Sequence, residues 1–182
     1  MKTKDLTTIA FMTAILVVLG LIPGIPLGII PVPIVLQNMG VMLASLILKP
    51  KHATMSIFLL LLLAALGLPV LSGGRGGLPI LLGPTAGYMF GWLLTPFLIN
   101  FGLSFLKNNN SIALKLLVVW LAGVICSDLI GTIWLTIQSQ VPFMTALFSN
   151  LAFLPGDTIK LILAFTMAKA LKAQPFSENT SL

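Results

Sequence analysis

The charged residues of this sequence stand at the edges of long apolar stretches instead of being spread along the chain. Only 8% of the 182 residues are charged and 58% are hydrophobic, with a mean hydropathy of +1.10. A water-soluble globule carries roughly 25% charged residues. So few charges cannot cover a protein of this size, and most of its outer surface must therefore face lipid. The sequence predicts a polytopic membrane protein.

A helix that crosses a bilayer needs about 20 largely apolar residues. Six stretches of the sequence are candidates for such helices, and the connections between them are short. They lie near residues 6–22, 34–48, 53–70, 79–106, 112–137 and 143–170. We therefore predict an all-α fold with a single six-helix transmembrane domain over residues 1–172. Residues 173–182 are polar and are predicted to form a disordered tail.

The basic residues predict how the chain is oriented in the membrane. With six spans and a cytoplasmic N-terminus, eight of the ten basic residues fall on the cytoplasmic side. These eight are Lys2, Lys4, Lys49, Lys51, Lys107, Lys115, Lys169 and Lys172. The predicted outer loops contain only Arg75, so the positive-inside rule is satisfied. We predict that both termini are cytoplasmic.

Several classes of function are excluded by what the sequence lacks. The net charge of +6 does not indicate nucleic-acid binding, because the lysines are dispersed over helix ends instead of clustered on one face. Cys126 and His52 are the only cysteine and histidine, so no disulfide, metal-ligand set or Ser/His pair is expected. No Gly-x-x-x-x-Gly-Lys-Ser/Thr motif occurs, so this chain is not expected to hydrolyse nucleotides. We predict a protein that is not an enzyme and has no cofactor.

Three ionisable side chains fall within predicted spans, namely Asp128, Asp157 and Lys160. Each costs about 2.5–3.5 kcal/mol at the centre of a lipid-exposed helix, so each is expected to face a partner or a wet cavity. Asp157 and Lys160 are three residues apart and therefore share one helix face. Pro155 and Gly156 stand just before them and predict a broken helix, a feature common at transporter substrate sites. An internal ion pair without a binding role is the alternative.

Two predicted outer loops are further candidates for contact with a ligand. Ser72 to Gly77 contains four glycines around Arg75, and such a backbone can approach a ligand closely. The alternative is a flexible hairpin between helices. The proline-rich segment 23–33 is stiff, and it predicts either a lid over an outward cavity or a segment at the level of the lipid headgroups.

Small residues recur every fourth position in two predicted helices, a spacing that allows close helix approach in lipid. Gly83, Gly87 and Gly91 predict a stripe that packs inside the bundle. Ala10 and Ala14 repeat the pattern in the first helix, where they either pack internally or dock another membrane protein.

Four motifs resemble those of the BioY family, the biotin-specific S components of energy-coupling-factor (ECF) importers. They are Pro-Val-Pro-Ile-Val-Leu-Gln at 31–37, Gly-Gly-Arg-Gly-Gly at 73–77, Leu-Gly-Pro-Thr-Ala-Gly-Tyr at 82–88, and Phe-Leu-Pro-Gly-Asp-x-x-Lys at 153–160. The resemblance covers nearly the whole chain. It implies six helices, an outward-facing biotin pocket and location in the bacterial cell membrane. The implied partners are a transmembrane coupling subunit and two ATPase subunits on separate chains.

The resemblance also implies roles for individual residues. The substrate-binding residues predicted from the resemblance and from the chemistry of the residues are Gln37, Asn38, Gly73, Gly74, Arg75, Tyr88, Asp128, Asp157 and Lys160. In this interpretation Asp157 accepts from a ureido N–H of biotin, Lys160 donates to polar ligand atoms, and Tyr88 covers the rings. Arg75 or the glycine-loop N–H groups would hold the carboxylate. Asp128 stands where the family pattern has a tyrosine, and its role is left open.

Ala10 and Ala14 receive a docking role from the same resemblance, because S components contact the coupling subunit through such a motif in the first helix. The second hypothesis is a proton-coupled secondary transporter of a small organic solute, in which Asp128 and Asp157 relay protons. An intramembrane enzyme is a third hypothesis, but the sequence offers no plausible nucleophile and base for it.

Overall fold

The structure is a computed structural model that describes residues 2–26, 28, 31–107 and 111–172. Within these residues the fold is all-helical, with only two isolated β-bridges, which confirms the predicted class. In chain order the helices are α1 (Thr3–Leu21), α2 (Gln37–Ile47), α3 (Pro50–Ala65), α4 (Leu78–Leu81), α5 (Ala86–Ser104), α6 (Ile112–Trp120), the π-helical turn η1 (Leu121–Ile125), α7 (Cys126–Ser139), α8 (Phe143–Asn150) and α9 (Leu154–Lys172). The predicted tail at 173–182 lies outside the described residues.

The helices follow the six predicted stretches but differ in length. Judged by length and composition, α1, α5 and the continuous run Ile112–Ser139 can each cross a bilayer. The bent pair α8 and α9, with an angle of 47° between its parts, makes a fourth candidate if it counts as one span. α2 and α3 are apolar but shorter. The six-span topology and the cytoplasmic termini therefore stay predictions.

α2 is short and lies at the centre of the bundle. Its 11 residues rise about 16 Å at 1.5 Å per residue, roughly half of a bilayer core. Every residue from Gly40 to Leu46 is buried, and α2 packs against both α5 and α9. The chain reaches α2 through a non-helical segment in which Ile25 and Ile34 exchange backbone hydrogen bonds of 2.9 and 2.8 Å. Prolines at 31 and 33 disfavour helix there.

The fourth predicted stretch is not one continuous helix. α4 ends at Leu81 and α5 begins at Ala86, so Gly83 lies in the connection and not in the predicted glycine stripe. The other two glycines do pack internally, as predicted. A Cβ on Gly87 would fall 2.2 Å from the Cβ of Trp134, and one on Gly91 would fall 3.0 Å from the backbone of Ser127. Glycine at these positions lets α5 and α7 approach closely.

The sixth stretch is broken, as predicted, but at residues 151–153 and not at Pro155–Gly156. Pro155 lies in the first turn of α9, where a helix tolerates proline because the first N–H groups have no intrahelical partner. Asp157 lies in the same turn, close to the positive end of the helix dipole. The break therefore places this carboxylate at the start of a helix inside the bundle.

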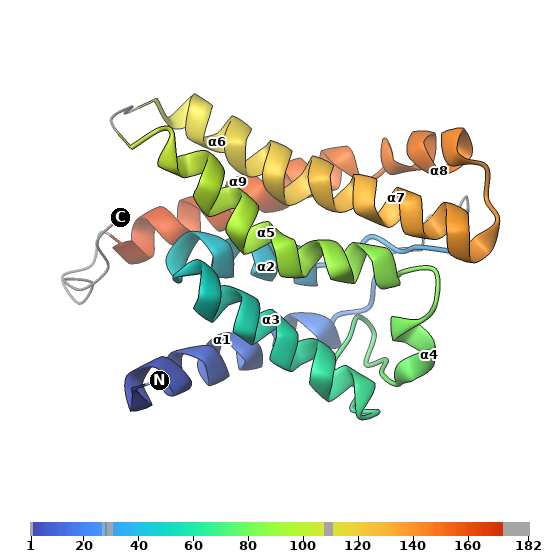
Figure 1. Ribbon diagram of the computed structural model, residues 1–182, viewed down its shortest axis with the longest axis horizontal. Coiled ribbons are helices and arrows are strands. Elements are labelled where there is room, and N and C mark those ends of the chain that lie inside the picture. The colour runs from blue at the N-terminus through green and yellow to red at the C-terminus, as the bar shows by residue number, and fades with distance from the viewer. Residues whose placement is uncertain (1, 27, 29–30, 108–110, 173–182) are drawn as a thin grey trace.

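The bundle has two distinct ends. At the loop end lie the connection after α1, the glycine-rich segment after α3 and the turn between α7 and α8 (Figure 1). At the opposite end, here called the terminal end, α1 begins and α9 ends (Figure 1).

Candidate substrate-binding site

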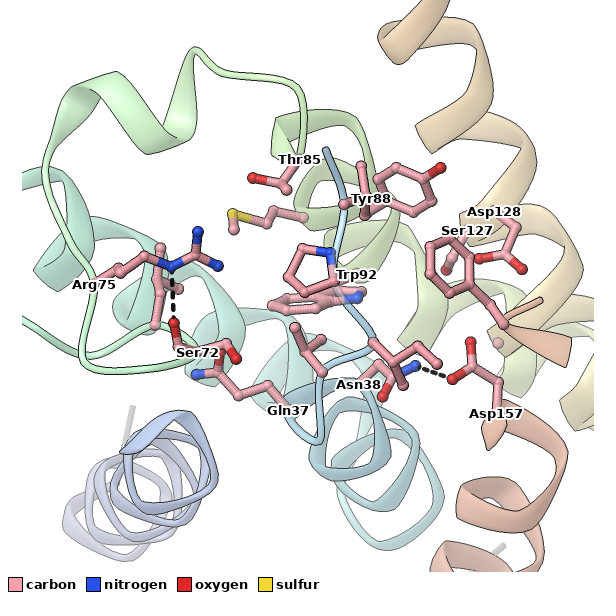
Figure 2. A pocket seen from close by; sticks show the side chains of 18 residues that line it. Gln37, Asn38, Ser72, Arg75, Thr85, Tyr88, Trp92, Ser127, Asp128 and Asp157 are labelled. Carbon is pink, nitrogen blue, oxygen red and sulfur yellow. Dashed lines mark hydrogen bonds between the residues drawn. The ribbon is translucent and has the colours of Figure 1, made fainter. Parts of the chain in front are cut away.

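A cavity lies among α2, α5, α7 and α9, toward the loop end of the bundle. Its volume is about 60 Å³, and aliphatic and aromatic side chains make up much of its wall. The polar residues in the wall are Gln37, Asn38, Ser72, Arg75, Thr85, Tyr88, Ser127, Asp128 and Asp157 (Figure 2). Six of these nine residues were predicted and two more, Ser72 and Ser127, lie beside a predicted one in the sequence, so the structure brings most of the candidate site together.

A larger outer cleft of about 660 Å³ adjoins this cavity. The proline-rich segment and the glycine-rich loop form its walls. The cleft and the cavity share four lining residues, Val32, Pro33, Ser72 and Arg75. The wall between the two spaces is therefore made of loop residues instead of helices.

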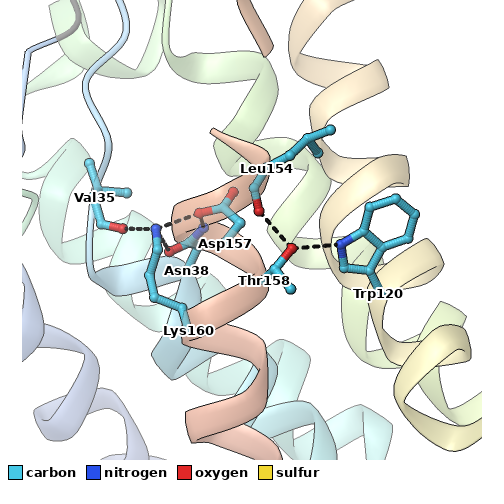
Figure 3. A network of polar contacts seen from close by, with 7 residues as sticks. All are labelled: Val35, Asn38, Trp120, Leu154, Asp157, Thr158 and Lys160. Atoms are coloured by element: carbon cyan, nitrogen blue, oxygen red, sulfur yellow. Dashed lines mark hydrogen bonds and ion pairs between the residues drawn. The ribbon is translucent and has the colours of Figure 1, made fainter. Parts of the chain in front are cut away.

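Asp157, Lys160 and Asn38 form one polar network beside the cavity (Figure 3). Asp157 Oδ1 lies 2.5 Å from Lys160 Nζ and accepts a 2.9 Å hydrogen bond from Asn38 Nδ2. Lys160 Nζ also donates to Asn38 Oδ1 at 2.9 Å and to the Val35 carbonyl at 2.7 Å. Three ammonium donors thus meet three acceptors, and the two charges neutralise each other within buried surroundings.

Lys160 does not have the position that the sequence interpretation gave it. Asp157 and Asn38 line the cavity, but Lys160 is absent from the lining, because its ammonium group turns to the Val35 carbonyl behind them. Lys160 therefore positions Asp157 and Asn38 instead of facing the cavity itself. The ion pair still adjoins an open space through Asp157 and is not sealed in apolar packing.

A second polar network surrounds Asp128 and Tyr88, and Figure 2 shows Asp128 on the same side of the cavity as Asp157. The Tyr88 hydroxyl donates to Asn150 Oδ1 at 2.9 Å, and Asn150 Nδ2 donates to the Asp128 carbonyl and to Thr132 Oγ1. This network holds the backbone of Asp128 but does not use its carboxylate fully. Asp128 Oδ2 is buried and has no hydrogen-bond partner. Such an oxygen can accept from a donor that enters the cavity.

Arg75 and Asp157 lie on opposite sides of the cavity (Figure 2). Arg75 Nε donates to the Ser72 carbonyl at 2.9 Å, which fixes the guanidinium group where the cavity meets the outer cleft. Because Leu71 and Arg75 exchange backbone hydrogen bonds of 2.9 and 3.1 Å, the glycine-rich loop is a closed turn. The cavity therefore has a cation at one side and an acid at the other.

The remaining predicted residues of this site have mixed positions. Gly73 lines the outer cleft, whereas Gly74 lines neither space and its N–H donates to the Gly20 carbonyl at 3.4 Å. Both glycines have positive φ angles of 75° and 67°, which explains their use in the turn. Gln37 lines the cavity, but its amide nitrogen donates to the carbonyls of Leu16 and Val70. Gln37 thus ties the C-terminal half of α1 to the segment just before the glycine-rich loop.

Sequence reasoning missed several residues of the site, among them Trp92, Phe153 and Asn150. Trp92 lines the cavity and stands four residues after Tyr88, so the shared helix face could have revealed it. Phe153 also lines the cavity, and its ring meets the Tyr88 ring edge-on at a centroid distance of 6.1 Å. Asn150 holds Tyr88 in place, but only its polarity within an apolar stretch sets it apart in the sequence.

The predicted docking residues Ala10 and Ala14 are both exposed on α1. They do not pack inside the bundle, so the internal-packing alternative is wrong for these two alanines. Phe11, between them in sequence, is 69% exposed. This face of α1 is therefore open to lipid or to another membrane protein.

Comparison with known proteins identifies the family. The family model described as "BioY family" matches residues 1–175 of the chain. The chain belongs to the BioY family. This match confirms the resemblance inferred from the four motifs. Membership of this family and the apolar helices together indicate a multi-pass bacterial membrane protein.

Individual relatives match over nearly their full length. The chain is 52% identical to the "Biotin transporter BioY" of Lactococcus lactis, over 95% of this chain and 93% of that protein. It is 40% identical to the "Biotin transporter BioY" of Rhizobium etli, over 93% and 94% respectively. Its fold is similar to the crystal structure of the S-component for biotin from an ECF-type ABC transporter, with a TM-score of 0.88 and 50% identity, over 96% of this chain and 95% of that one.

Proposed function

We propose that this chain is the S component of an ECF-type importer and that it captures biotin from the outer side of the membrane. The observation that carries the proposal is the cavity with Asp157 on one side and Arg75 on the other. Biotin has a ureido ring with two N–H donors at one end and a carboxylate at the other. The polarity of the cavity matches both ends of this molecule.

The chemistry of each end assigns a role to the lining residues. Asp157 accepts from one ureido N–H, and the unpartnered Oδ2 of Asp128 accepts from a donor on the same ring system. Arg75 holds the carboxylate through charge-assisted hydrogen bonds. The rings of Tyr88 and Trp92 cover the fused apolar rings of the vitamin.

Entry of biotin requires a movement of the loop wall. Cavities that enclose small molecules usually measure about 300–1,000 Å³, far more than the 60 Å³ of the inner cavity. The wall shared with the outer cleft consists of Val32, Pro33, Ser72 and Arg75, which all lie outside the helices. An outward shift of these two loops joins the cavity to the cleft, while the helices that carry Asp128 and Asp157 stay fixed.

The remainder of the importer is supplied by other chains in this proposal. Exposed Ala10 and Ala14 offer a flat face on α1 for a transmembrane coupling subunit. Two ATPase subunits would supply the energy. The proton-relay hypothesis is not favoured, because Asp157 is paired with Lys160 and because the named relatives are biotin transporters.

Equilibrium binding of labelled biotin to the purified chain tests the proposal, with dethiobiotin and lipoate as competitors. We expect tight binding at constant pH without any ion gradient, and weaker competition by lipoate, which has no ureido ring. Vesicles that carry this chain alone should not accumulate biotin. Accumulation driven by a pH gradient in such vesicles would contradict the proposal.

The role of Asp157 is tested by Asp157→Asn, which keeps the shape of the side chain and removes its charge. We expect biotin affinity to fall at least tenfold, or about 1.4 kcal/mol. Asp5→Asn is the matched control, because Asp5 lies near the start of α1 and far from the cavity. Unchanged affinity in a folded Asp157→Asn protein would remove Asp157 from the site.

A further inference from the structure

A second large cleft lies at the terminal end of the bundle, away from the cavity. Its volume is about 530 Å³, and it is bounded by the ends of α2, α5 and α9 and by the beginning of α6. Figure 1 shows these four helix ends on the left side of the bundle. The cleft shares no lining residue with the cavity or with the outer cleft.

Three lysines line this cleft and no acid does. Lys107 follows the end of α5, Lys115 lies near the start of α6, and Lys169 lies in the last turns of α9. Within the described part of the chain, the two ion pairs are His52–Asp5 and Lys160–Asp157, so neither involves these lysines. The cleft therefore gathers positive charge that the described residues do not neutralise.

Ordinary helix electrostatics account for only part of this pattern. Lys107 and Lys169 lie near helix C-termini, where a cation is favoured by the helix dipole. Lys115 lies one turn after the start of α6, where the dipole disfavours a cation. An anion in the cleft would interact favourably both with Lys115 and with the N-terminal end of α6.

The walls between the lysines are apolar. Leu46, Leu103 and Phe165 line the cleft, from three different helices. A free inorganic anion gains nothing from contact with apolar walls, whereas a lipid has a charged headgroup next to hydrocarbon chains that can pack against them. On the predicted orientation these lysines face the cytoplasmic leaflet, and basic pockets between helices on that side suit anionic headgroups.

We propose that this cleft is a binding site for an anionic phospholipid. The phosphate lies among Lys107, Lys115 and Lys169, and the upper part of an acyl chain lies against Leu103 and Phe165. The site is independent of biotin, since no residue of it lines the cavity. Lys49 and Lys51 are on the same predicted side of the membrane but do not line the cleft. They can therefore be used to separate the general attraction of lysines to anionic lipid from binding in the cleft.

The test compares two triple variants with equal loss of charge. The site variant is Lys107→Gln, Lys115→Gln and Lys169→Gln; the control is Lys4→Gln, Lys49→Gln and Lys51→Gln, at lysines outside the cleft. Native mass spectrometry of the full chain in detergent, titrated with phosphatidylglycerol or phosphatidylcholine, measures lipid binding. We expect the parent chain to prefer phosphatidylglycerol, with at least tenfold weaker binding in the site variant and less than a twofold change in the control.

Two results would overturn the proposal. Equal weakening in both triple variants would mean that only the overall charge attracts the lipid. Displacement of phosphatidylglycerol by millimolar inorganic phosphate would mean that the cleft binds simple anions. A thermal melt of both variants in lipid-free detergent checks folding, and Leu103→Gln tests the apolar wall separately, with an expected loss of lipid binding while all three lysines remain.

Discussion

Two polar networks border the same cavity, and they differ in how completely their groups are paired. The α9 network joins Asp157, Asn38 and Lys160, and the ammonium group of Lys160 uses three acceptors. The α7 network around Tyr88 and Asn150 leaves Asp128 Oδ2 buried without a partner. The ammonium donors of the first network are therefore all paired without a ligand, whereas the second network leaves a buried acceptor unpaired.

This difference indicates that one network mainly stabilises the site, whereas the other offers a free group to a ligand. A buried charge pair costs desolvation energy, but removal of one partner costs more because it leaves the other charge uncompensated. The α9 network should therefore control stability first, whereas the unpartnered carboxylate of Asp128 in the α7 network should control affinity more than stability. The variants below test this division.

Lys160→Met should have the strongest effect on stability. The substitution leaves the buried Asp157 carboxylate without its cation, and loss of one member of a buried pair costs about 3–5 kcal/mol. Thermal unfolding in detergent measures the change. The double variant Lys160→Met with Asp157→Leu should regain most of the lost stability and still fail to bind biotin. If the double variant is as unstable as the single one, the charge pair does not explain the role of Lys160.

Gly131→Ala should have the next strongest effect, and it acts on the α7 network. A Cβ at Gly131 would lie 2.4 Å from the Tyr88 ring, so the ring must move. Overpacking of this kind costs about 1–3 kcal/mol. Gly156→Ala is the matched control, because its Cβ would meet only Ile34, at 3.9 Å. We expect this control to gain up to about 1 kcal/mol, as alanine favours helix. Equal effects of the two substitutions on melting and on biotin affinity would contradict the role of Tyr88.

Much of the fold could be predicted because lipid imposes simple rules on sequence. Apolar stretches indicated where the helices lie, and the glycine spacing indicated that Gly87 and Gly91 pack inside the bundle. The second stretch, 34–48, is already shorter than a full span in the sequence, but its position at the centre of the bundle could not be predicted, because a central stretch is as apolar as one that faces lipid. The helix break predicted from Pro155 was a few residues too late in the sequence, because a helix accepts proline in its first turn.

The site was predictable within one helix and less so between helices. The i, i+3 spacing correctly paired Asp157 with Lys160. It could not show that Lys160 turns away from the cavity, because that depends on the Val35 carbonyl, 125 residues away in sequence. The same holds for Asn38, which bonds to Asp157 of α9, and for Asn150, which accepts from Tyr88 of α5, because each bond joins helices that are distant along the chain. Local spacing carries no information on such contacts.

Asp128→Leu should separate affinity from stability. The substitution removes a buried carboxylate that has an unpartnered oxygen, so the stability of the protein should stay unchanged or rise. Biotin affinity should fall about tenfold, or 1.4 kcal/mol, because the ligand loses an acceptor. Isothermal calorimetry and thermal unfolding together measure both effects. Lower stability with unchanged affinity would make Asp128 a structural residue, and the α7 network would then stabilise the fold and not contact the ligand through this carboxylate.

Tyr88→Phe should have the smallest effect of the series. It removes the hydroxyl that donates to Asn150 Oδ1 but keeps the ring edge-on to Phe153. Loss of one hydrogen bond costs about 0.5–1.5 kcal/mol, so the protein should melt at a slightly lower temperature. Biotin affinity should change less than threefold, since the ring and not the hydroxyl covers the ligand. In this proposal the hydroxyl does not contact the ligand and can affect it only by orienting Asn150 and, through it, Asp128. A tenfold loss of affinity would therefore mean that the α7 network positions the ligand as firmly as the α9 network does.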